Sequence, residues 1–425
     1  MQSLFEDSPE YTQRLKTPFV PTKVTLAEIH AAVPKDLWKK STAKGLYYVC
    51  RDIFFAVLTY KLGVFIDPFV QMLVMNHGLP IIAAKLVKAA LWLTYWHWQG
   101  VILAGWWCLG HEAGHGTLSS RSWINHSVGY SLHTFLLVPY YAWRSSHHAH
   151  HKATGSIERD ENYVPRTRTD YNLPPEQHSH PLDYAEIFEE TPIFTLYRML
   201  MMQAFGWQYY LLTNALGSPN YPPGTNHFSP SSALFKPHER EGIIASNIGI
   251  GAMSFILYLY TKQVGFSYFI KLYFIPYLLA NHWIVMLTFL HHSDPSIPHF
   301  RNKEWSFLRG ALATVDRPLL GWAGRFFLHN VSHDHISHHL FSSIPFYNQP
   351  EVTEHIKKVL KEDYNYDSTN SARALYRSFS ECCFIEDEGD VMFYKNKNGR
   401  AARELGSFTS HATRPSLAAA LKPDL

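Results

Sequence analysis

The sequence has 425 residues, with 38 Lys and Arg against 35 Asp and Glu and a formal net charge of +3. This balance does not favour a nucleic-acid-binding protein, and we expect no nucleic acid partner. Only 17% of the residues are charged and 15% are aromatic, whereas an ordinary soluble domain has about 25% charged residues. This bias predicts membrane segments, while a mean hydropathy of −0.16 predicts that much of the chain lies outside the bilayer.

Residues 1–45 are polar and interrupted by proline, and they fit either a short amphipathic element with a basic turn or a disordered leader. The first sixteen residues lack the apolar core of a signal peptide, so we expect insertion to depend on internal segments. None of the four cysteines lies in a CxxC pattern, which argues against a disulfide framework or a thiolate metal site.

Four segments are long and apolar enough to be predicted as transmembrane helices: residues 47–66, 89–110, 243–260 and 266–290. The first contains Arg51, Asp52 and Lys61, and the second is rich in Trp and Tyr, as at a membrane surface. Because two hairpins of two spans each return the chain to the same side, the sequence predicts an all-α integral membrane protein with about four transmembrane helices.

A further segment, residues 127–143, is apolar but contains His133 and Pro139. If it crossed the membrane, His115 and His147 would lie on opposite sides. We therefore expect this segment to lie in the interface or to re-enter, so that the histidine clusters on either side of it share one face. Residues 152–192 are predicted to form a polar surface loop.

Histidine is unusually abundant, at 26 residues, and it is clustered. HEAGH (111–115) matches H-E-x-x-H, the signature of zinc proteases. A second cluster is HHAHH (147–151), and a third is HDHISHHLF (333–341). The segment LHHSDP (290–295), at the end of the last predicted span, carries two more histidines.

The spacing within the clusters indicates metal binding. His111 and His115 are four residues apart, and the second and third clusters repeat an i, i+3, i+4 spacing that puts side chains on one face of a helix. Each cluster is therefore expected to aim its imidazoles at one point. Neutral imidazole is a common ligand of iron, zinc, copper and nickel. Eight or nine such ligands exceed the needs of one metal ion and predict two.

Two other functions remain as alternatives. A zinc protease needs only one ligand beyond HEAGH, together with an aqueous cleft, and would leave most of these histidines unused. A membrane metal transporter would place acidic residues or histidines within its spans, where Asp52 and His282 are the only candidates. Metal content separates these hypotheses: about two irons per chain, one zinc, or variable loading.

The three clusters resemble the H-x-x-x-H, H-x-x-H-H and distal H-x-x-H-H boxes of the membrane fatty acid desaturases. The stretches WQGVILAGWWCLGHEAGH, LHHSDPSIPHF and HISHHLFSSIPFYNQPEVTE are similar to the oleate Δ12 (omega-6) type, and the resemblance covers roughly residues 45–365. It implies a four-span helical protein with a cytosolic cap and a non-haem di-iron centre. The metal ligands that it implies are His111, His115, His147, His150, His151, His292, His335, His338 and His339.

The boxes depart from the usual family pattern at two places. Ala113 stands where close relatives have cysteine, and His333 and Asp334 stand where relatives often have D-T before the third box. Such changes beside the ligands affect their orientation and leave the position of oxidation open. Glu112 and Asp334 are expected either to orient ligands or handle protons, or merely to cap helices and form salt bridges.

The resemblance implies an O2-dependent oxidoreductase that introduces a cis double bond at Δ12 of an oleoyl chain in phospholipid. An ω3 (Δ15) desaturase, a Δ12 acetylenase and an acyl hydroxylase remain alternatives on the same scaffold. The chain has no Rossmann glycine pattern and no H-P-G-G stretch, so electrons are expected from a separate cytochrome b5, reduced by NADH-cytochrome b5 reductase. Candidates for a basic docking surface are Lys152, Arg159, Arg166 and Arg168, although a solvated loop with scattered charge is the default interpretation of these residues.

These expectations divide the chain into three parts. Residues 1–45 form a polar N-terminal region, residues 46–365 a membrane desaturase domain, and residues 366–425 a cytosolic tail that is disordered in part, from Gly406 onward. The family also implies a multi-pass protein of the endoplasmic reticulum membrane, with its active site facing the cytosol.

Overall fold

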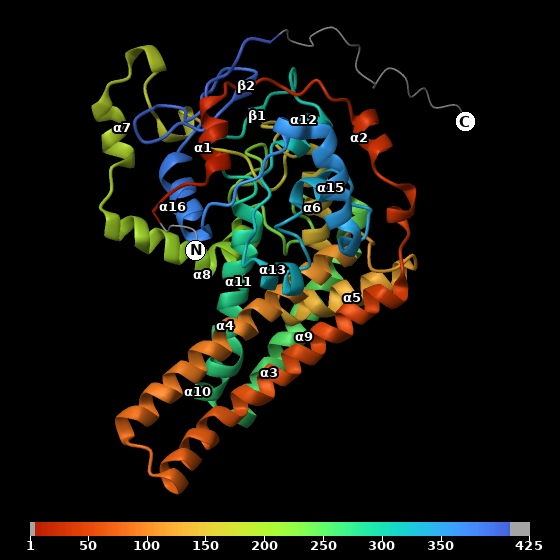
Figure 1. Ribbon diagram of the computed structural model, residues 1–425, viewed down its shortest axis with the longest axis vertical. Helices are drawn as coiled ribbons and strands as arrows, with labels where there is room; N and C mark the ends of the chain where they lie inside the picture. The colour runs from red at the N-terminus through yellow and green to blue at the C-terminus, as the bar shows by residue number, and fades with distance from the viewer. Residues whose placement is uncertain (1–4, 409–425) are drawn as a thin grey trace.

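The computed structural model describes residues 5–408 and is almost entirely helical. Figure 1 shows long helices that extend from one side of a cap built of shorter helices and loops. These helices are α3 (Thr42–His77), α4 (Ile81–Gly114), α9 (Arg240–Val264) and α11 (Ile275–Phe289). Another long helix, α8 (Pro192–Thr213), runs in a different direction.

The shorter helices complete the cap and the connections between the long helices. They are α1 (Pro9–Lys16), α2 (Leu26–Ala32), α5 (Ser122–Phe135), α6 (Tyr140–Ala153), α7 (Pro181–Phe188), α10 (Phe266–Phe269), α12 (Phe307–Leu312), α13 (Trp322–Phe327), α14 (His335–Leu340), α15 (Gln349–Leu360) and α16 (Ser371–Glu381). Two short strands, β1 (His299–Phe300) and β2 (Val391–Met392), pair antiparallel. A π-helical turn, Ile270–Phe274, joins α10 to α11.

Three helical stretches of the described chain are long and apolar enough to cross a membrane: Thr42–His77, Pro237–Val264 and Phe266–Phe289. They contain three of the four predicted spans. The fourth predicted segment lies in α4, which has 34 residues and runs beside α3 (Figure 1). Polar side chains lower the hydropathy of α4, but Gln99 is buried and accepts a hydrogen bond from Thr59 of α3. A polar residue that is paired inside a helix hairpin is compatible with a membrane span.

The hairpin of α3 and α4 turns at Gly78. This residue has φ 62°, and its N–H donates to Leu73 O, which closes the end of α3 in a left-handed cap. Pro80 then precedes the first residue of α4. The sequence Gly-Leu-Pro therefore ends one helix and starts the next within three residues.

The segment between the first two histidine clusters does not cross the membrane. Its helix α5 has 14 residues, fewer than the roughly 20 that a span needs. Leu137, with φ 57°, then turns the chain into α6. Because α5 doubles back, α6 returns to the end of α4, and the first and second clusters meet on one side as predicted.

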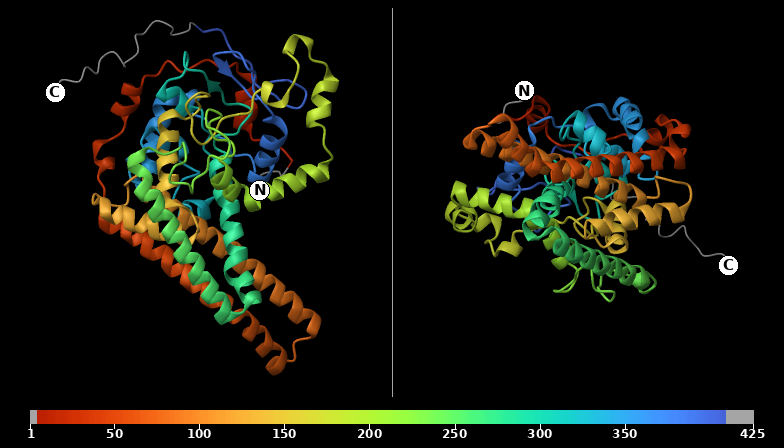
Figure 2. Two further views of the ribbon diagram at one scale, coloured as in Figure 1. Left: turned by 180° about the vertical axis from the view of Figure 1, so that it is seen from behind. Right: turned by 90° about the horizontal axis from the view of Figure 1, so that it is seen from below.

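Helix α8 differs from the spans in its direction. Figures 1 and 2 show α7 and α8 projecting to one side of the cap, with α8 crossing the end of α11. One side of α8 packs against α11 through residues such as Trp207 and Leu211, whereas Ile193, Leu200 and Phe205 on the other side are exposed. An exposed apolar face at the place where the spans meet the cap fits a helix that lies in the membrane interface.

The two ends of the described chain pack together on the cap. Ser8, the N-cap of α1, donates to Asp367, and Phe19 forms a bridge with Leu405. Residues 5–45 are therefore folded, as are residues 366–408, which include α16 and β2. Most of the tail predicted to be disordered, residues 409–425, lies outside the described residues.

Candidate metal centre

The structure brings all nine histidines of the predicted ligand set together. His111 and His115 lie at the end of α4, the second cluster lies on α6, and the third lies on α14. His292 follows α11. Four separate parts of the chain therefore converge where the spans meet the cap.

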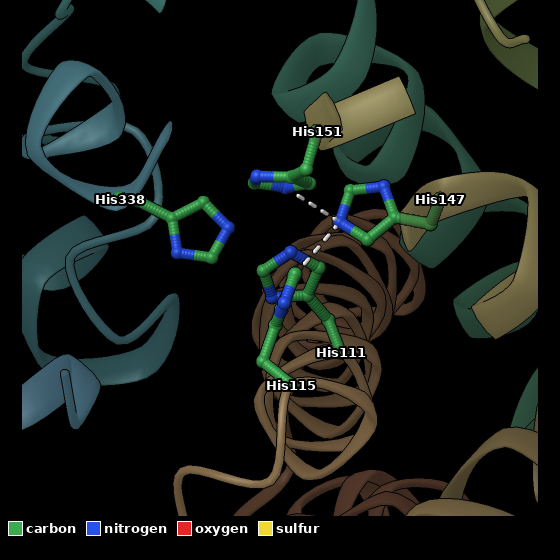
Figure 3. Close-up of side chains that lie close together, drawn as sticks. All are labelled: His111, His115, His147, His151 and His338. Carbon is green, nitrogen blue, oxygen red and sulfur yellow. Dashed lines mark hydrogen bonds between the residues drawn. The ribbon is translucent and has the colours of Figure 1, made fainter. Parts of the chain in front are cut away.

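Five of these histidines form one group, which we call the five-histidine group. Figure 3 shows its members pointing toward a common centre: His111, His115, His147, His151 and His338. Nε2 of His147 lies 3.1 Å from Nε2 of both His115 and His151. Two imidazole nitrogens bound to one metal at about 2.0–2.1 Å lie roughly 3.0–3.4 Å apart. The spacing is therefore that of neighbouring ligands.

The other four form a second group, the four-histidine group. Its members are His150, His292, His335 and His339. Nε2 of His335 lies 3.1 Å from Nε2 of both His292 and His339. The rings of His151 and His339 stack at 4.2 Å between centroids, so the two groups are immediate neighbours. Two adjacent metal positions follow from this arrangement.

The division of the ligands differs from the expectation that each cluster aims at one point. On α6, His147 and His151 join one group while His150 joins the other. On α14, His335 and His339 stay together and His338 turns to the five-histidine group. Residues four apart on a helix are rotated by only about 40°, whereas a residue three positions on points about 60° to the other side. Helices α6 and α14 therefore each supply histidines to both groups.

Five histidines of the two groups are held in the neutral form that binds metals. Burial, reinforced by neighbouring imidazoles, places the pKa of His151, His292, His335 and His339 well below the usual value of a histidine. The pKa of His338 is lowered to about 3, first by burial and then by His111. No proton therefore has to be displaced before these imidazoles coordinate a metal at neutral pH.

Contacts on the far side of the rings fix their orientation. Nδ1 of His150 lies 2.7 Å from Oδ1 of the buried Asp160, which also accepts from the N–H of Asn162. Nδ1 of His335 donates to Val331 O, and Nδ1 of His339 lies 3.1 Å from Thr154 Oγ1. Such contacts leave Nε2 for the metal. No local pattern in the sequence marks Asp160, because its partner can be identified only once the chain is folded.

Glu112 and Asp334 have different surroundings. Oε1 of the buried Glu112 lies 3.1 Å from Nδ1 of His111 and 3.7 Å from Nδ1 of His338, and Oε2 accepts from Thr117. Asp334 instead pairs with Arg325 at 3.0 Å. Glu112 therefore contacts two members of the five-histidine group, whereas the carboxylate of Asp334 is held in a salt bridge.

His148 and His291 lie beside the groups without joining them. Nδ1 of His291 donates to Val315 O at 2.6 Å, and Nε2 of His148 donates to Gly114 O at 3.0 Å. The pKa of His148 is lowered to about 4, by burial first and then by the charge of Arg144. Both histidines were left out of the predicted ligand set, and neither belongs to the two groups.

A cavity of about 950 Å³ opens onto the metal centre. Members of both histidine groups line its inner end, together with Trp107 and Trp143, whose rings stack on His111 and His147. Its outer part runs between α8 and α11 and reaches the loops 162–170 and 213–225. A largely apolar cavity that ends on two groups of metal-ligating side chains suits a long apolar substrate.

One predicted surface residue is not on the surface. Arg168 was expected to belong to a docking surface, but it is buried and donates to both carboxylate oxygens of Glu386 at 2.6 and 2.7 Å. That prediction is wrong, because the part of the loop around Arg168 folds against the C-terminal part of the cap, where Thr167 forms a bridge with Ile385. Arg159 remains exposed, although its guanidinium covers the Trp305 ring at 3.9 Å.

Comparisons with known proteins identify the family of this chain. The family model described as Fatty acid desaturase matches residues 90–370. A Delta(12) fatty acid desaturase of Mortierella alpina is 40% identical over 376 residues, covering 87% of this chain and 90% of the relative. An oleate hydroxylase of Claviceps purpurea is 35% identical over 429 residues, covering 92% and 86%. An endoplasmic reticulum omega-6 fatty acid desaturase of Brassica juncea is 36% identical over 379 residues, covering 88% and 92%. The chain is a membrane oxidoreductase of the fatty acid desaturase family.

Proposed function

We propose that this protein is an O2-dependent acyl-lipid desaturase that converts an oleoyl chain into a linoleoyl chain by introducing a cis double bond at Δ12. The observation that carries the proposal is the pair of adjacent histidine groups at the inner end of an apolar cavity. The names of the relatives from Mortierella alpina and Brassica juncea, a Delta(12) and an omega-6 fatty acid desaturase, support the Δ12 position.

The donor set fits two iron ions. Nε2 of His338 is buried without a hydrogen-bond partner among the described residues, as expected of a nitrogen that faces a metal. The five-histidine group would hold one iron and the four-histidine group the other. When bound, the irons supply the O2-derived oxidising power that removal of hydrogen from an unactivated methylene requires.

The protein itself orients the ligands, excludes water from the site and holds a proton near it. The reaction consumes one oleoyl chain, O2, two electrons and two protons, and yields one linoleoyl chain and two water molecules. Trp107 and Trp143 pack beside the ligands and limit access of water. Asp160 holds His150, while Glu112, beside His111 and His338, is the acidic group best placed to hold a proton near the reacting atoms.

The substrate is expected to be a membrane lipid. Tyr209 and Thr213 at the end of α8 line the outer part of the cavity. The exposed apolar face of the same helix would place this region at the bilayer surface. An acyl chain could then enter from a phospholipid that remains in the membrane, which favours an acyl-lipid carrier over soluble acyl-coenzyme A.

The electrons are proposed to come from cytochrome b5, itself reduced by NADH-cytochrome b5 reductase. The absence of a dinucleotide fingerprint and of a fused cytochrome b5 motif from the sequence supports a separate donor. We place the protein in the endoplasmic reticulum membrane, with the cap in the cytosol where this donor operates. The name of the Brassica juncea relative, which includes the endoplasmic reticulum, supports that location.

The test is the fatty-acid profile of a microbial host whose own lipids stop at monoenes. Expression of the chain is expected to produce Δ9,12 diene, and the His335→Ala variant is expected to produce none. Hydroxylated oleate would instead favour the oleate hydroxylase activity for which the Claviceps purpurea relative is named. A triene or an alkyne made only from added linoleate would favour an ω3 desaturase or acetylenase, and would contradict the Δ12 assignment.

Gly206 provides a test of the cavity as the substrate path. It lies in α8 at the cavity wall, where an added Cβ would meet Met202 Cγ at 3.2 Å and Val285 Cγ2 at 3.7 Å. A phenylalanine side chain would enter the cavity, so Gly206→Phe is expected to reduce diene formation about tenfold or more, through steric exclusion of the chain. Diene per unit of protein, measured with the iron content, checks this.

Gly206→Ala is the matched control, and it is expected to keep activity close to the wild type. It adds one methyl group and removes the cost of glycine within a helix, about 1 kcal/mol. Full activity of Gly206→Phe at normal expression would show that the acyl chain does not pass this wall.

A further inference from the structure

Helix α6 carries a basic face beside the face that holds the metal ligands. Arg144, His148 and Lys152 follow one another at intervals of four residues, so they form one stripe along the helix. We call these three residues the α6 basic face. Lys152 is exposed, and Arg144 and His148 are partly exposed. The stripe therefore faces solvent while its neighbours on the same helix face the metal centre.

His148 connects this face to the five-histidine group. Its ring stacks on that of His115, with 5.2 Å between centroids and 22° between planes. Its Nε2 also donates to Gly114 O, which fixes the ring against the end of α4. A single aromatic ring thus lies between one ligand and the surface of the cap.

The stretch of sequence that carries this face has positive charges only. No Asp or Glu occurs in the sequence between Glu112 and Glu158, whereas Arg121, Arg144 and Lys152 do. Among residues 5–408, neither Arg144 nor Lys152 has an ion-pair partner. The acid Glu239 contacts this stretch of α6 through Ser145, not through Arg144. Two unpaired cations on one short face attract an acidic surface.

We infer that the α6 basic face is the docking surface of the acidic haem protein that donates electrons, and that His148 is a positioning residue whose ring lies on the path of each electron to His115. The inference rests on the proposed function. In each docking event the ferrous haem iron of the donor is oxidised to the ferric state, and one electron passes to the metal centre. Two such events supply the two electrons consumed for each double bond.

This surface differs from the one expected from the loop 152–192. Arg168 of that loop is buried in its pair with Glu386, and Arg166 lies at the mouth of the cavity. Of the four predicted docking residues, only Lys152 lies on the α6 basic face, where His148 stacks on the ring of His115. The short path through His148 favours this face.

The experiment measures binding of the soluble haem domain of cytochrome b5 to the full-length, iron-loaded protein in lipid nanodiscs. Lys152→Glu is expected to raise Kd about tenfold at low salt, and less at high salt, because the interaction is between exposed charges. Lys152→Arg should bind as the wild type does. The matched control is Lys397→Glu, which reverses another exposed cation of the cap and should change Kd less than about twofold.

A wild-type Kd for Lys152→Glu, with weaker binding for Lys397→Glu, would overturn the inference and move the docking surface to the C-terminal part of the cap. Failure of the wild type to bind would overturn it as well. Diene formation by the wild type, scored separately, shows whether the proposed function fails too.

The role of His148 has its own readout. His148→Gln is expected to slow oxidation of bound ferrous donor several-fold, while Kd and iron content stay unchanged, since glutamine keeps a donor for Gly114 O but lacks a ring to stack on His115. Loss of iron in this variant would show that His148 supports the site structurally. An unchanged oxidation rate would show that electrons take another path.

Discussion

Replacement of His292 by alanine is expected to lower the iron content from about two to about one per chain and to abolish diene formation. The change leaves three imidazoles in the four-histidine group, His150, His335 and His339, while the five-histidine group is untouched. Loss of residues that merely orient ligands costs roughly 10–100-fold in metal affinity or activity, so loss of a direct ligand should cost on the order of a hundredfold or more. Elemental analysis and fatty-acid profiles of the same preparation check both expectations.

His333→Gln is the matched control for this variant. His333 lies two residues before His335 and is buried, but it belongs to neither histidine group. We expect it to keep both irons and most of the activity. Two irons per chain in His292→Ala, with normal activity, would remove His292 from the ligand set, and would restrict the second metal position to residues of the three boxes.

The spans could be predicted from the sequence because apolarity over about 20 residues is a local property. Helix α4 shows the limit of this signal. Its Trp, Tyr, His and Gln residues lower its hydropathy, and only the folded hairpin shows that Gln99 faces Thr59 of α3. The direction of α8 is likewise invisible in the sequence, since its apolar residues fit a buried helix and an interfacial one equally well.

The identity of the clustered histidines could also be predicted, because i, i+3 and i+4 spacing on a helix is local. Their partition could not. Whether His150 and His338 turn to one metal position or the other depends on how α4, α6 and α14 cross, which is a tertiary property. The same holds for Asp160, which reaches His150 only through a turn that follows α6.

Interactions between distant parts of the chain could not be predicted from the sequence. Arg168 was predicted to be exposed, but its partner Glu386 lies 218 residues away. The segment after α11 shows the same effect. Its Asp294 meets Arg317 and Arg377, residues that spacing alone does not relate to each other. These residues and Asp367 form a buried network of ion pairs, in which Arg317 contacts both carboxylates.

Replacement of Arg317 by methionine is expected to destabilise the fold by about 3–5 kcal/mol, since it leaves the buried carboxylates of Asp294 and Asp367 to share the single charge of Arg377. Arg317 donates to Asp367 at 2.5 Å, to Asp294 at 2.6 Å and to Leu290 O at 3.0 Å. The side chains of Arg317, Asp294 and Asp367 are all buried. Because Leu290 and Asp294 flank His292, iron should also be lost. The melting temperature in detergent is expected to fall by roughly 5–10 °C.

The pH dependence gives this prediction a second readout. Burial alone would raise the pKa of Asp294 and Asp367, but Arg317 and Arg377 outweigh it and hold both values below the usual range. A carboxylate with a lowered pKa in the folded state stabilises the fold above its unfolded pKa of about 3.9, and this contribution is lost as the pH falls through the folded value. Without Arg317 one carboxylate should take up a proton more readily, so the difference in melting temperature between variant and wild type should narrow from pH 7.5 to pH 5.

Arg198→Met is the matched control, since it removes an arginine that is 52% exposed and pairs with Glu190 at the surface. Exposed pairs of this kind contribute about 0–1 kcal/mol, so its melting temperature should stay close to that of the wild type at both pH values. Equal effects of the two substitutions would show that the buried network is no more important than a surface ion pair. A large effect confined to Arg317→Met, with loss of iron, would show that the network holds the segment around His292 in place.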